Sequence, residues 1–297
     1  RDTQGDHGRE ASLNLQKHLR LPEWIRPRLA LSETRRVRTL LRQSGVLTVC
    51  EEARCPNRAE CFSKPSAAFM ILGPSCTRNC GFCSIENGNA GPVDKNEPAR
   101  VAASARGMGL EFVVVTSVTR DDLPDGGAGQ FALTVRALKR NGPGVRVEVL
   151  TPDFKGRTGP VDTVLESGPD VFNHNLETVP SLYSEVRPGA DYGRSLRVLE
   201  HAKSGKSGLR TKSGLMLGLG ESLKEVESVL VDLRSVGCDF VTIGQYLRPG
   251  RKNLPVSEYV VPEVFEALGE TALGMGFRYV ASSPLTRSSM NAREMFS

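Results

Sequence analysis

Six short runs of apolar residues recur along the chain, and each has about the length of a β-strand. Within a run, apolar residues follow one another almost without interruption instead of alternating with polar ones. Continuous apolar runs of this length are typical of strands that are buried on both faces, as in parallel sheets. The runs cover residues 67–72, 111–116, 145–150, 170–174, 213–219 and 239–244.

Segments with the apolar spacing of α-helices alternate with these runs. Strand followed by helix, repeated along the chain, predicts parallel strands joined by right-handed crossovers. Six such units are fewer than the eight of a closed barrel. The pattern therefore favours an α/β fold with an open, partial (β/α)6 barrel, and a doubly wound open sheet is the alternative. In both architectures, ligands bind at the carboxyl ends of the strands. The helical segments cover residues 98–109, 128–141, 159–167, 193–205, 222–236 and 262–275.

Two extensions flank the predicted barrel. Residues 1–66 form an N-terminal extension, residues 67–280 the barrel and residues 281–297 a C-terminal segment. The first extension contains three cysteines, and the second contains the polar stretch RSSM at residues 287–290.

Composition and charge exclude several classes of protein. The 297 residues are 39% hydrophobic, which is ample for one barrel core, and the formal net charge is +5. Because no basic stripe concentrates this charge, we expect no nucleic-acid partner. No apolar run reaches the roughly 18 residues of a membrane span, so we expect no membrane partner. The first twenty residues lack the apolar centre of a secretory signal.

The cysteines are clustered rather than spread along the chain. There are seven, an odd number; six fall between Cys50 and Cys83, and Cys238 stands alone. This distribution fits a secreted disulfide framework poorly and indicates metal binding in a reducing compartment. We expect Cys238 to be a small buried residue.

Cys76, Cys80 and Cys83 form a triad that begins four residues after the first apolar run. Structural zinc sites usually have four ligands, and no histidine lies between His18 and His174 to complete one. A cubane iron–sulfur cluster held by three cysteines keeps one iron free for another ligand. The triad, with Phe82 before its last cysteine, resembles the signature of radical S-adenosylmethionine enzymes. That resemblance implies that the cofactor's methionine end binds the free iron and that the reduced cluster cleaves the cofactor to a 5′-deoxyadenosyl radical.

A second triad, Cys50, Cys55 and Cys61, lies upstream in the sequence VCEEARCPNRAEC. Taken alone, its spacing is also compatible with a zinc half-site or with buried thiols. Together with the first triad it resembles the lipoyl synthase family, in which CxxxxCxxxxxC holds an auxiliary [4Fe–4S] cluster. The segments AECF and DVFNHNLE resemble the bacterial members of that family more than the mitochondrial ones. The resemblance covers roughly residues 21–290 and extends to FMILGPSCTRNCGFC, TSVTRDDLPDGGA, TPDFKGR, VFNHNLETVP, RPGADY, LMLGLGE, GQYLRP and PLTRSSM.

The RSSM stretch is similar to the C-terminal RSSY motif of that family, in which a serine is the fourth ligand of the auxiliary cluster. The register of the motif points to Ser289. Met290 stands where the family has tyrosine, so whatever packing or hydrogen bond the tyrosine provides is lost here. The alternative is that RSSM is only a polar tail.

The resemblance also implies residues that contact S-adenosylmethionine at the strand ends. Each has a structural alternative: acids of the loop at 120–127 can cap a helix, His174 can be a core residue, and the glycines at 218–221 can simply shape a turn. Arg194 and Lys212 are further candidates, for the cofactor carboxylate or an acidic partner. The expected contact residues are Phe82, Thr116, Ser117, Asn175, Glu177, Arg187 and Glu221.

The activity implied by the resemblance is the insertion of sulfur at C6 and C8 of a protein-bound octanoyl-lysine, which makes the lipoyl cofactor. Two [4Fe–4S] clusters, two S-adenosylmethionine molecules per lipoyl group and a sacrificial auxiliary cluster are implied with it. Expected partners are octanoylated carrier domains (2-oxoacid dehydrogenase acyltransferase subunits and glycine-cleavage H protein), flavodoxin or ferredoxin as electron donor, and iron–sulfur carrier proteins. A bacterial member would be cytoplasmic and a eukaryotic one would lie in the mitochondrial matrix. The alternatives are another radical enzyme with an auxiliary cluster, of methylthiotransferase or maturase type, and a non-catalytic metal protein.

Overall fold

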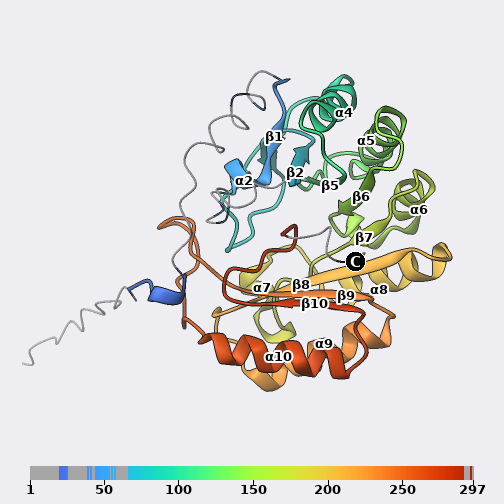
Figure 1. The fold of residues 1–297 in the computed structure, drawn as a ribbon. Helices are drawn as coiled ribbons and strands as arrows, with labels where there is room; N and C mark the ends of the chain where they lie inside the picture. Colours follow the sequence, from blue (N-terminus) through green and yellow to red (C-terminus); the bar gives the residue numbers. More distant parts are fainter. Residues whose placement is uncertain are drawn as a thin grey trace, which may run out of the picture.

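One curved sheet of eight strands organises the chain in the computed structural model (Figure 1). The structure describes residues 20–25, 39, 41, 44–53, 55, 57, 66–290 and 295. Seven strands run parallel, and β1 pairs antiparallel with β2. The order is β1 (Leu47–Thr48), β2 (Ser66–Ile71), β5 (Phe112–Ser117), β6 (Arg146–Leu150), β7 (Val171–Asn173), β8 (Arg210–Leu217), β9 (Phe240–Gln245) and β10 (Tyr279–Ser282).

The predicted α/β partial barrel is confirmed, and each of the six apolar runs contributes a strand. The strand β10 adds a seventh parallel strand that the apolar pattern did not predict. Its four residues are all half-buried, so it lacks the continuous apolar signal of the other strands.

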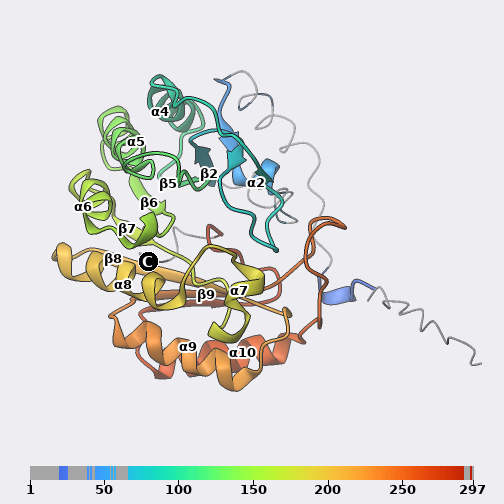
Figure 2. The ribbon, with the colours of Figure 1, turned by 180° about the vertical axis from the view of Figure 1, so that it is seen from behind.

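Helices cover the convex side of the sheet, as Figures 1 and 2 show from opposite sides. The apolar face of each packs on the strands that precede and follow it, which explains the helical spacing seen in the sequence. The long helices are α4 (Glu97–Gly107), α5 (Ala128–Asn141), α6 (Thr158–Glu166), α8 (Tyr192–Gly205), α9 (Leu223–Ser235) and α10 (Pro262–Gly274). The short ones are η1 (Glu23–Ile25), α2 (Val49–Glu52), η2 (Phe154–Gly156), η3 (Pro180–Leu182) and α7 (Tyr183–Val186).

Local signals fix where several helices begin. Ser222 and Glu225 form a capping box at the start of α9, with each side chain hydrogen-bonded to the backbone of the other residue. Asp125 accepts the N–H groups of Gly127 and Gly129 at 2.9 Å and 2.8 Å and thereby starts α5. Capping by an acid of the 120–127 loop, the structural alternative weighed for that loop, is therefore present at Asp125.

The interior of the barrel is partly polar. Glu148, Asn173 and Lys212 on strands β6, β7 and β8 are fully buried. Apolar clusters on the outer side of the strands, under the helices, supply the hydrophobic core instead. No helix among the described residues is long and apolar enough to cross a membrane.

Candidate active site

The first cysteine triad lies on the loop that follows β2, next to the carboxyl end of β5. Two short strands, β3 (Ser75–Cys76) and β4 (Glu86–Asn87), pair at the base of this loop. The sulfur of Cys76 accepts the backbone N–H of Thr119 at 3.3 Å and that of Arg78 at 3.4 Å. The triad therefore begins at the edge of the sheet where ligands of parallel folds bind.

Gly81, between the second and third cysteines, is required by close packing. Its N–H donates to the Val186 carbonyl at 3.0 Å, and its own carbonyl accepts the N–H of Leu254 at 3.0 Å. A Cβ here would lie 2.8 Å from the Leu254 side chain, so a larger residue would displace the loop. The Asn253 amide also donates to the Cys83 carbonyl at 2.6 Å.

The three cysteines of this loop are half-buried. Burial raises the pKa of Cys80, and it raises the pKa of Cys83 to about 11. Iron binding would therefore release protons from these thiols. Among the described residues, no three His, Cys, Asp or Glu side chains converge on one point as the ligands of a single metal ion do. Thiolates that hold a cubane bind separate iron corners and need not converge in this way.

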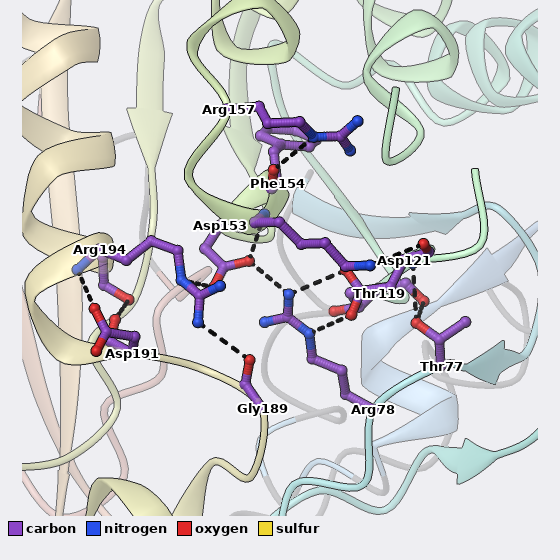
Figure 3. Close-up of polar contacts among 12 residues, drawn as sticks. Thr77, Arg78, Thr119, Asp121, Asp153, Phe154, Arg157, Gly189, Asp191 and Arg194 are labelled. Carbon is purple, nitrogen blue, oxygen red and sulfur yellow. Dashed lines mark hydrogen bonds and ion pairs between the residues drawn. The ribbon is translucent and has the colours of Figure 1, made fainter. Parts of the chain in front are cut away.

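A buried ion-pair network fixes the cysteine loop to two strand ends (Figure 3). The guanidinium of Arg78 donates to Asp121 at 2.7 Å and 3.0 Å and to Asp153 at 2.7 Å. Arg194 of α8 lies on the other side of Asp153, with Nε 3.2 Å from its carboxylate. Asp121 follows β5 and Asp153 follows β6, so one arginine of the triad loop is held by both.

The charges of this network reinforce one another. Burial acts against the charged form of Arg78, but the hydrogen bonds to Asp121 and Asp153 outweigh it and raise the pKa of Arg78. Burial likewise opposes the charged form of Asp153, and the Arg78 hydrogen bond and charge lower its pKa to about 2. Both groups are thus ionised at neutral pH.

The second triad approaches the barrel from the N-terminal extension. Cys50 is buried in α2, directly after β1, and Cys55 is half-buried. Cys61 lies outside the described residues. The hydroxyl of Ser84, one residue after the first triad, donates to the Glu52 carbonyl at 2.9 Å. This hydrogen bond joins the two cysteine segments directly.

A cavity of about 400 Å³ connects these parts. Cys83 and Phe82 of the first loop line it, and so do Cys50 and Cys55 of the second triad. Ser289 and its neighbours from the C-terminal segment complete the wall. Residues more than two hundred positions apart in the sequence therefore face the same space, which the spacing of the cysteines alone could not establish.

The C-terminal segment packs against both the sheet and the N-terminal extension. The Thr286 carbonyl lies against Gly244 of β9, where any Cβ would collide with it. The buried Asn57 amide donates to the Leu285 carbonyl and to the sulfur of Met290, the latter at 3.2 Å. Met290 thus makes a polar contact with the segment that carries Cys55.

The cation of Arg287 has no carboxylate partner within the part of the chain that the structure describes. Its guanidinium donates to the Thr286 carbonyl at 2.6 Å and lies near Cys55 at the cavity. A cation in this position, beside the second triad, suits the binding of an anionic group, such as a cluster with thiolate ligands.

The expected cofactor contacts fall into two groups. Phe82, Asn175 and Glu177 line the cavity. Glu177, with a left-handed φ of 66°, accepts the Asn175 amide at 3.0 Å, and burial raises its pKa against the opposing charge of Arg187. Arg187 also donates to the Asn175 carbonyl at 2.8 Å.

The remaining expected contacts lie outside the cavity lining. The Thr116 hydroxyl donates to the Leu150 carbonyl at 2.9 Å. Ser117 ends β5. Glu221 accepts the N–H groups of Gly218 and Leu219, so both of its oxygens hold the glycine turn.

Several buried polar atoms at the strand ends have no hydrogen-bond partner among the described residues. Such atoms are rare in folded proteins, and a group of them in one place indicates a site for a polar ligand. Burial lowers the pKa of His174 to about 4, so its imidazole is neutral, and only its Nδ1 is satisfied, by the Thr151 carbonyl at 2.9 Å. These atoms can donate or accept hydrogen bonds with a polar ligand. The atoms are Ser117 Oγ, Thr151 Oγ1, Asn173 Oδ1, His174 Nε2 and Arg187 Nε.

Comparisons with known proteins agree with this geometry. The model of the radical SAM superfamily matches residues 70–233. A lipoyl synthase of Caldanaerobacter subterraneus subsp. tengcongensis is 53% identical over 92% of this chain and 96% of its own length. A lipoyl synthase of Alkaliphilus metalliredigens is 51% identical over 93% of this chain and 95% of its own. The chain belongs to the lipoyl synthase family.

Solved structures confirm the fold at much lower identity. Methylornithine synthase matches with a TM-score of 0.55 and 16% identity, covering 89% of this chain and 88% of its own. Streptococcus suis SuiB bound to its precursor peptide matches with a TM-score of 0.59 and 12% identity, covering 83% and 52%. These likenesses concern the barrel, whereas membership of the lipoyl synthase family rests on the sequence relatives.

Some residues of this site escaped prediction, and two candidates pair with buried carboxylates of the chain itself. Lys212 was a candidate for the cofactor carboxylate or an acidic protein partner, but it is fully buried and paired with Glu148 at 3.1 Å. Arg194 was a candidate for the same roles, and its guanidinium instead faces Asp153. Neither Asp153 nor Glu148 was singled out, because only the fold shows which charges they meet.

Cys238 serves as an internal control for the cysteines of the two triads. It is fully buried, and burial raises its pKa to about 12, so it is a neutral thiol within the apolar core. We expect Cys238→Ala to retain the iron content of the reconstituted protein and to lower the free energy of unfolding by about 1 kcal/mol. Iron analysis and denaturant unfolding check both expectations, and a loss of iron would place Cys238 among the ligands.

Proposed function

We propose that the protein is a lipoyl synthase that inserts sulfur at C6 and C8 of an octanoyl chain attached to a lysine of a carrier protein. The observation that carries this proposal is the shared cavity, lined by Cys83 of the first triad and by Cys50, Cys55 and Ser289. A carbon that loses a hydrogen atom and then gains sulfur must lie close to the radical source and to the sulfur donor at once. A single cavity lined by residues of both triads meets this requirement for proximity.

Each triad would hold one [4Fe–4S] cluster. Cys76, Cys80 and Cys83 would bind the first and leave one iron for the methionine end of S-adenosylmethionine. When bound, this cluster supplies the electron that cleaves S-adenosylmethionine and yields the 5′-deoxyadenosyl radical. The second cluster is the sulfur donor and hence a substrate, and its ligands would be Cys50, Cys55, Cys61 and Ser289.

The chain's own residues orient the reactants and exclude water. The unpartnered atoms at the ends of β5, β6 and β7 would bind the polar groups of the cofactor. The cavity wall between the triads is largely apolar and suits a hydrocarbon chain, and a volume of about 400 Å³ lies in the range of small-molecule sites. The apolar part of the wall includes Val49, Ala67, Ala68, Leu215 and Met216.

The substrate class determines the expected partners. The octanoyl group would arrive on a carrier domain, such as an acyltransferase subunit of a 2-oxoacid dehydrogenase or the glycine-cleavage H protein. Two S-adenosylmethionine molecules would be cleaved per lipoyl group. A flavodoxin or ferredoxin would supply electrons, and iron–sulfur carriers would replace the consumed cluster, in the cytoplasm of a bacterial host.

One assay separates this function from its rivals. The reconstituted protein, with about eight irons for two cubanes, is incubated with dithionite, S-adenosylmethionine and an octanoyl-lysyl peptide. We expect 5′-deoxyadenosine together with a peptide that carries two added sulfur atoms. Formation of 5′-deoxyadenosine without any sulfur-containing peptide would point to another radical enzyme. One or two zinc ions per chain, without iron, would overturn the iron–sulfur assignment altogether.

A further inference from the structure

A buried ion pair inside the barrel plays no part in the proposed chemistry. Lys212 of β8 and Glu148 of β6 have side chains that are 1% and 0% exposed, and their charged atoms lie 3.1 Å apart. Moving two charges out of water is costly, and such pairs persist where additional hydrogen bonds satisfy them. The other hydrogen-bond partners of Lys212 and Glu148 therefore indicate the role of this ion pair.

Those partners lead to a single residue of the C-terminal segment. Lys212 Nζ donates to the backbone carbonyl of Ser288 at 2.5 Å. The Asn173 amide donates both to Glu148 at 2.7 Å and to the Ser288 hydroxyl at 2.9 Å. The Ser288 hydroxyl in turn donates to Asn175 Oδ1 at 3.0 Å. Ser288 is thus held through its hydroxyl by Asn173 and Asn175, at and just after the end of β7, and through its carbonyl by Lys212 of β8.

A backbone turn connects the anchored Ser288 to Ser289. The N–H of Met290 donates to the Arg287 carbonyl at 2.9 Å, which closes a turn with Ser288 and Ser289 at its centre. In such a turn the directions of the two central side chains are tied together. Holding Ser288 therefore restricts the backbone position of Ser289 and the direction in which its Cβ leaves the chain. Ser289 lines the cavity that Cys50 and Cys55 also line.

The two serines are not equivalent. The Ser288 hydroxyl is engaged both as donor and as acceptor. The Ser289 hydroxyl makes no hydrogen bond with any residue that the structure describes. Ser289 is accordingly the one whose oxygen is available for iron.

We propose that Ser288 is a positioning residue, and that Glu148, Asn173 and Lys212 form an anchor that places the Ser289 oxygen for the second cluster. This inference rests on the proposed function, because it takes Ser289 as an iron ligand. It gives a role to the first serine of RSSM and to a charged pair that the reaction itself does not need.

The test observes the second cluster directly and requires no turnover. The first triad is replaced by alanines in the full chain, so that only the second cluster forms with ⁵⁷Fe and sulfide. In this background, Ser288→Ala is compared with Ser289→Ala, with Ser288→Thr and with Ser283→Ala. Ser283 is the matched control, because its hydroxyl contacts Thr286 of the same segment at 2.9 Å but not the anchor. Mössbauer spectra report the oxygen-ligated iron, and a chelator reports the rate of iron release.

We expect Ser288→Ala to weaken the spectrum of the oxygen-ligated iron and to speed iron release by about tenfold, as for the loss of one or two hydrogen bonds. Ser289→Ala should remove that spectrum, whereas Ser288→Thr and Ser283→Ala should retain it. The inference is overturned if Ser288→Ala matches Ser283→Ala in spectrum and release rate, or if Ser289→Ala changes neither. Because ligation is measured without substrate, failure of the sulfur-insertion assay would be recognised separately.

Discussion

Cys55→Ala is expected to spare the cleavage of S-adenosylmethionine and to abolish sulfur insertion. Cys55 lines the cavity on the side of the N-terminal extension, whereas the loop at 76–83 is held by its own contacts with Thr119, Asp121 and Asp153. Removing one ligand of the second cluster should therefore leave the radical-generating site intact. The iron content should fall from about eight toward about four per chain.

Mass spectrometry of the nucleoside and peptide products measures both halves of this result. We expect 5′-deoxyadenosine at a wild-type rate when dithionite is the reductant, and no sulfur on the octanoyl-lysyl peptide. Cys238→Ala is the matched control, since it removes a thiol that lies in the apolar core. If Cys55→Ala abolishes both products, the two triads do not divide the reaction as proposed.

Asp153→Ala should be the most destabilising single change in the ion-pair network around the first triad. The Asp153 side chain is fully buried and faces two arginines, Arg78 and Arg194. Its loss leaves Arg78 buried with Asp121 as its remaining carboxylate partner. Breaking a buried pair typically costs about 3–5 kcal/mol, and the triad loop loses its attachment to the end of β6. Denaturant unfolding measures this loss, and the rate of 5′-deoxyadenosine formation measures its effect on the site.

An exposed pair provides the comparison. Asp94 and Arg100 lie 2.7 Å apart with side chains 47% and 37% exposed, and ion pairs at the surface contribute little to stability because water screens them. Asp94→Ala should therefore unfold near the wild-type midpoint. Equal costs for Asp94→Ala and Asp153→Ala would show that the buried network contributes no special stability.

The same network predicts a dependence on pH. The pKa of Asp153 is lowered to about 2 in the folded chain, below the value of about 3.9 for an unperturbed aspartate. A lowered pKa stabilises the folded state fully above the unfolded value, and this stabilisation is lost as pH falls from about 4 to about 2. The free energy of unfolding of Asp153→Ala should decline less steeply over that interval than that of the wild type.

The fold was largely predictable because its strands are buried on both faces. The run at 111–116 corresponds to β5, Phe112–Ser117, and the helix expected at 128–141 is α5. Continuous apolar runs and helical spacing match the observed strands and helices closely, because both patterns arise from burial against the neighbouring layer. The strand β10 was missed because four half-buried residues carry no such pattern.

The site was predictable where chemistry and spacing coincide, and not where distant charges meet. Three thiols after a strand indicate a cluster site on local grounds alone. The contact between Lys212 and Glu148, 64 positions apart, follows from the curvature that brings β8 and β6 to one interior. In the sequence, Glu148 interrupts an apolar run and Lys212 precedes one, and neither position indicates a shared partner. The residues expected to contact the cofactor, and the extension boundaries, stay predictions.

The antiparallel pairing of β1 with β2 has a consequence for the proposed consumption of the second cluster as sulfur donor. Leu47 pairs with Met70 and Thr48 with Phe69, through backbone hydrogen bonds that involve no metal. Cys50 lies two residues beyond this ladder, so it remains beside the cavity after the donor cluster is spent. Rebuilding the proposed cluster between turnovers would then start from at least one ligand, Cys50, that the sheet already holds in place. The edge strand β1 would thus keep Cys50 in position for a new cluster after each reaction.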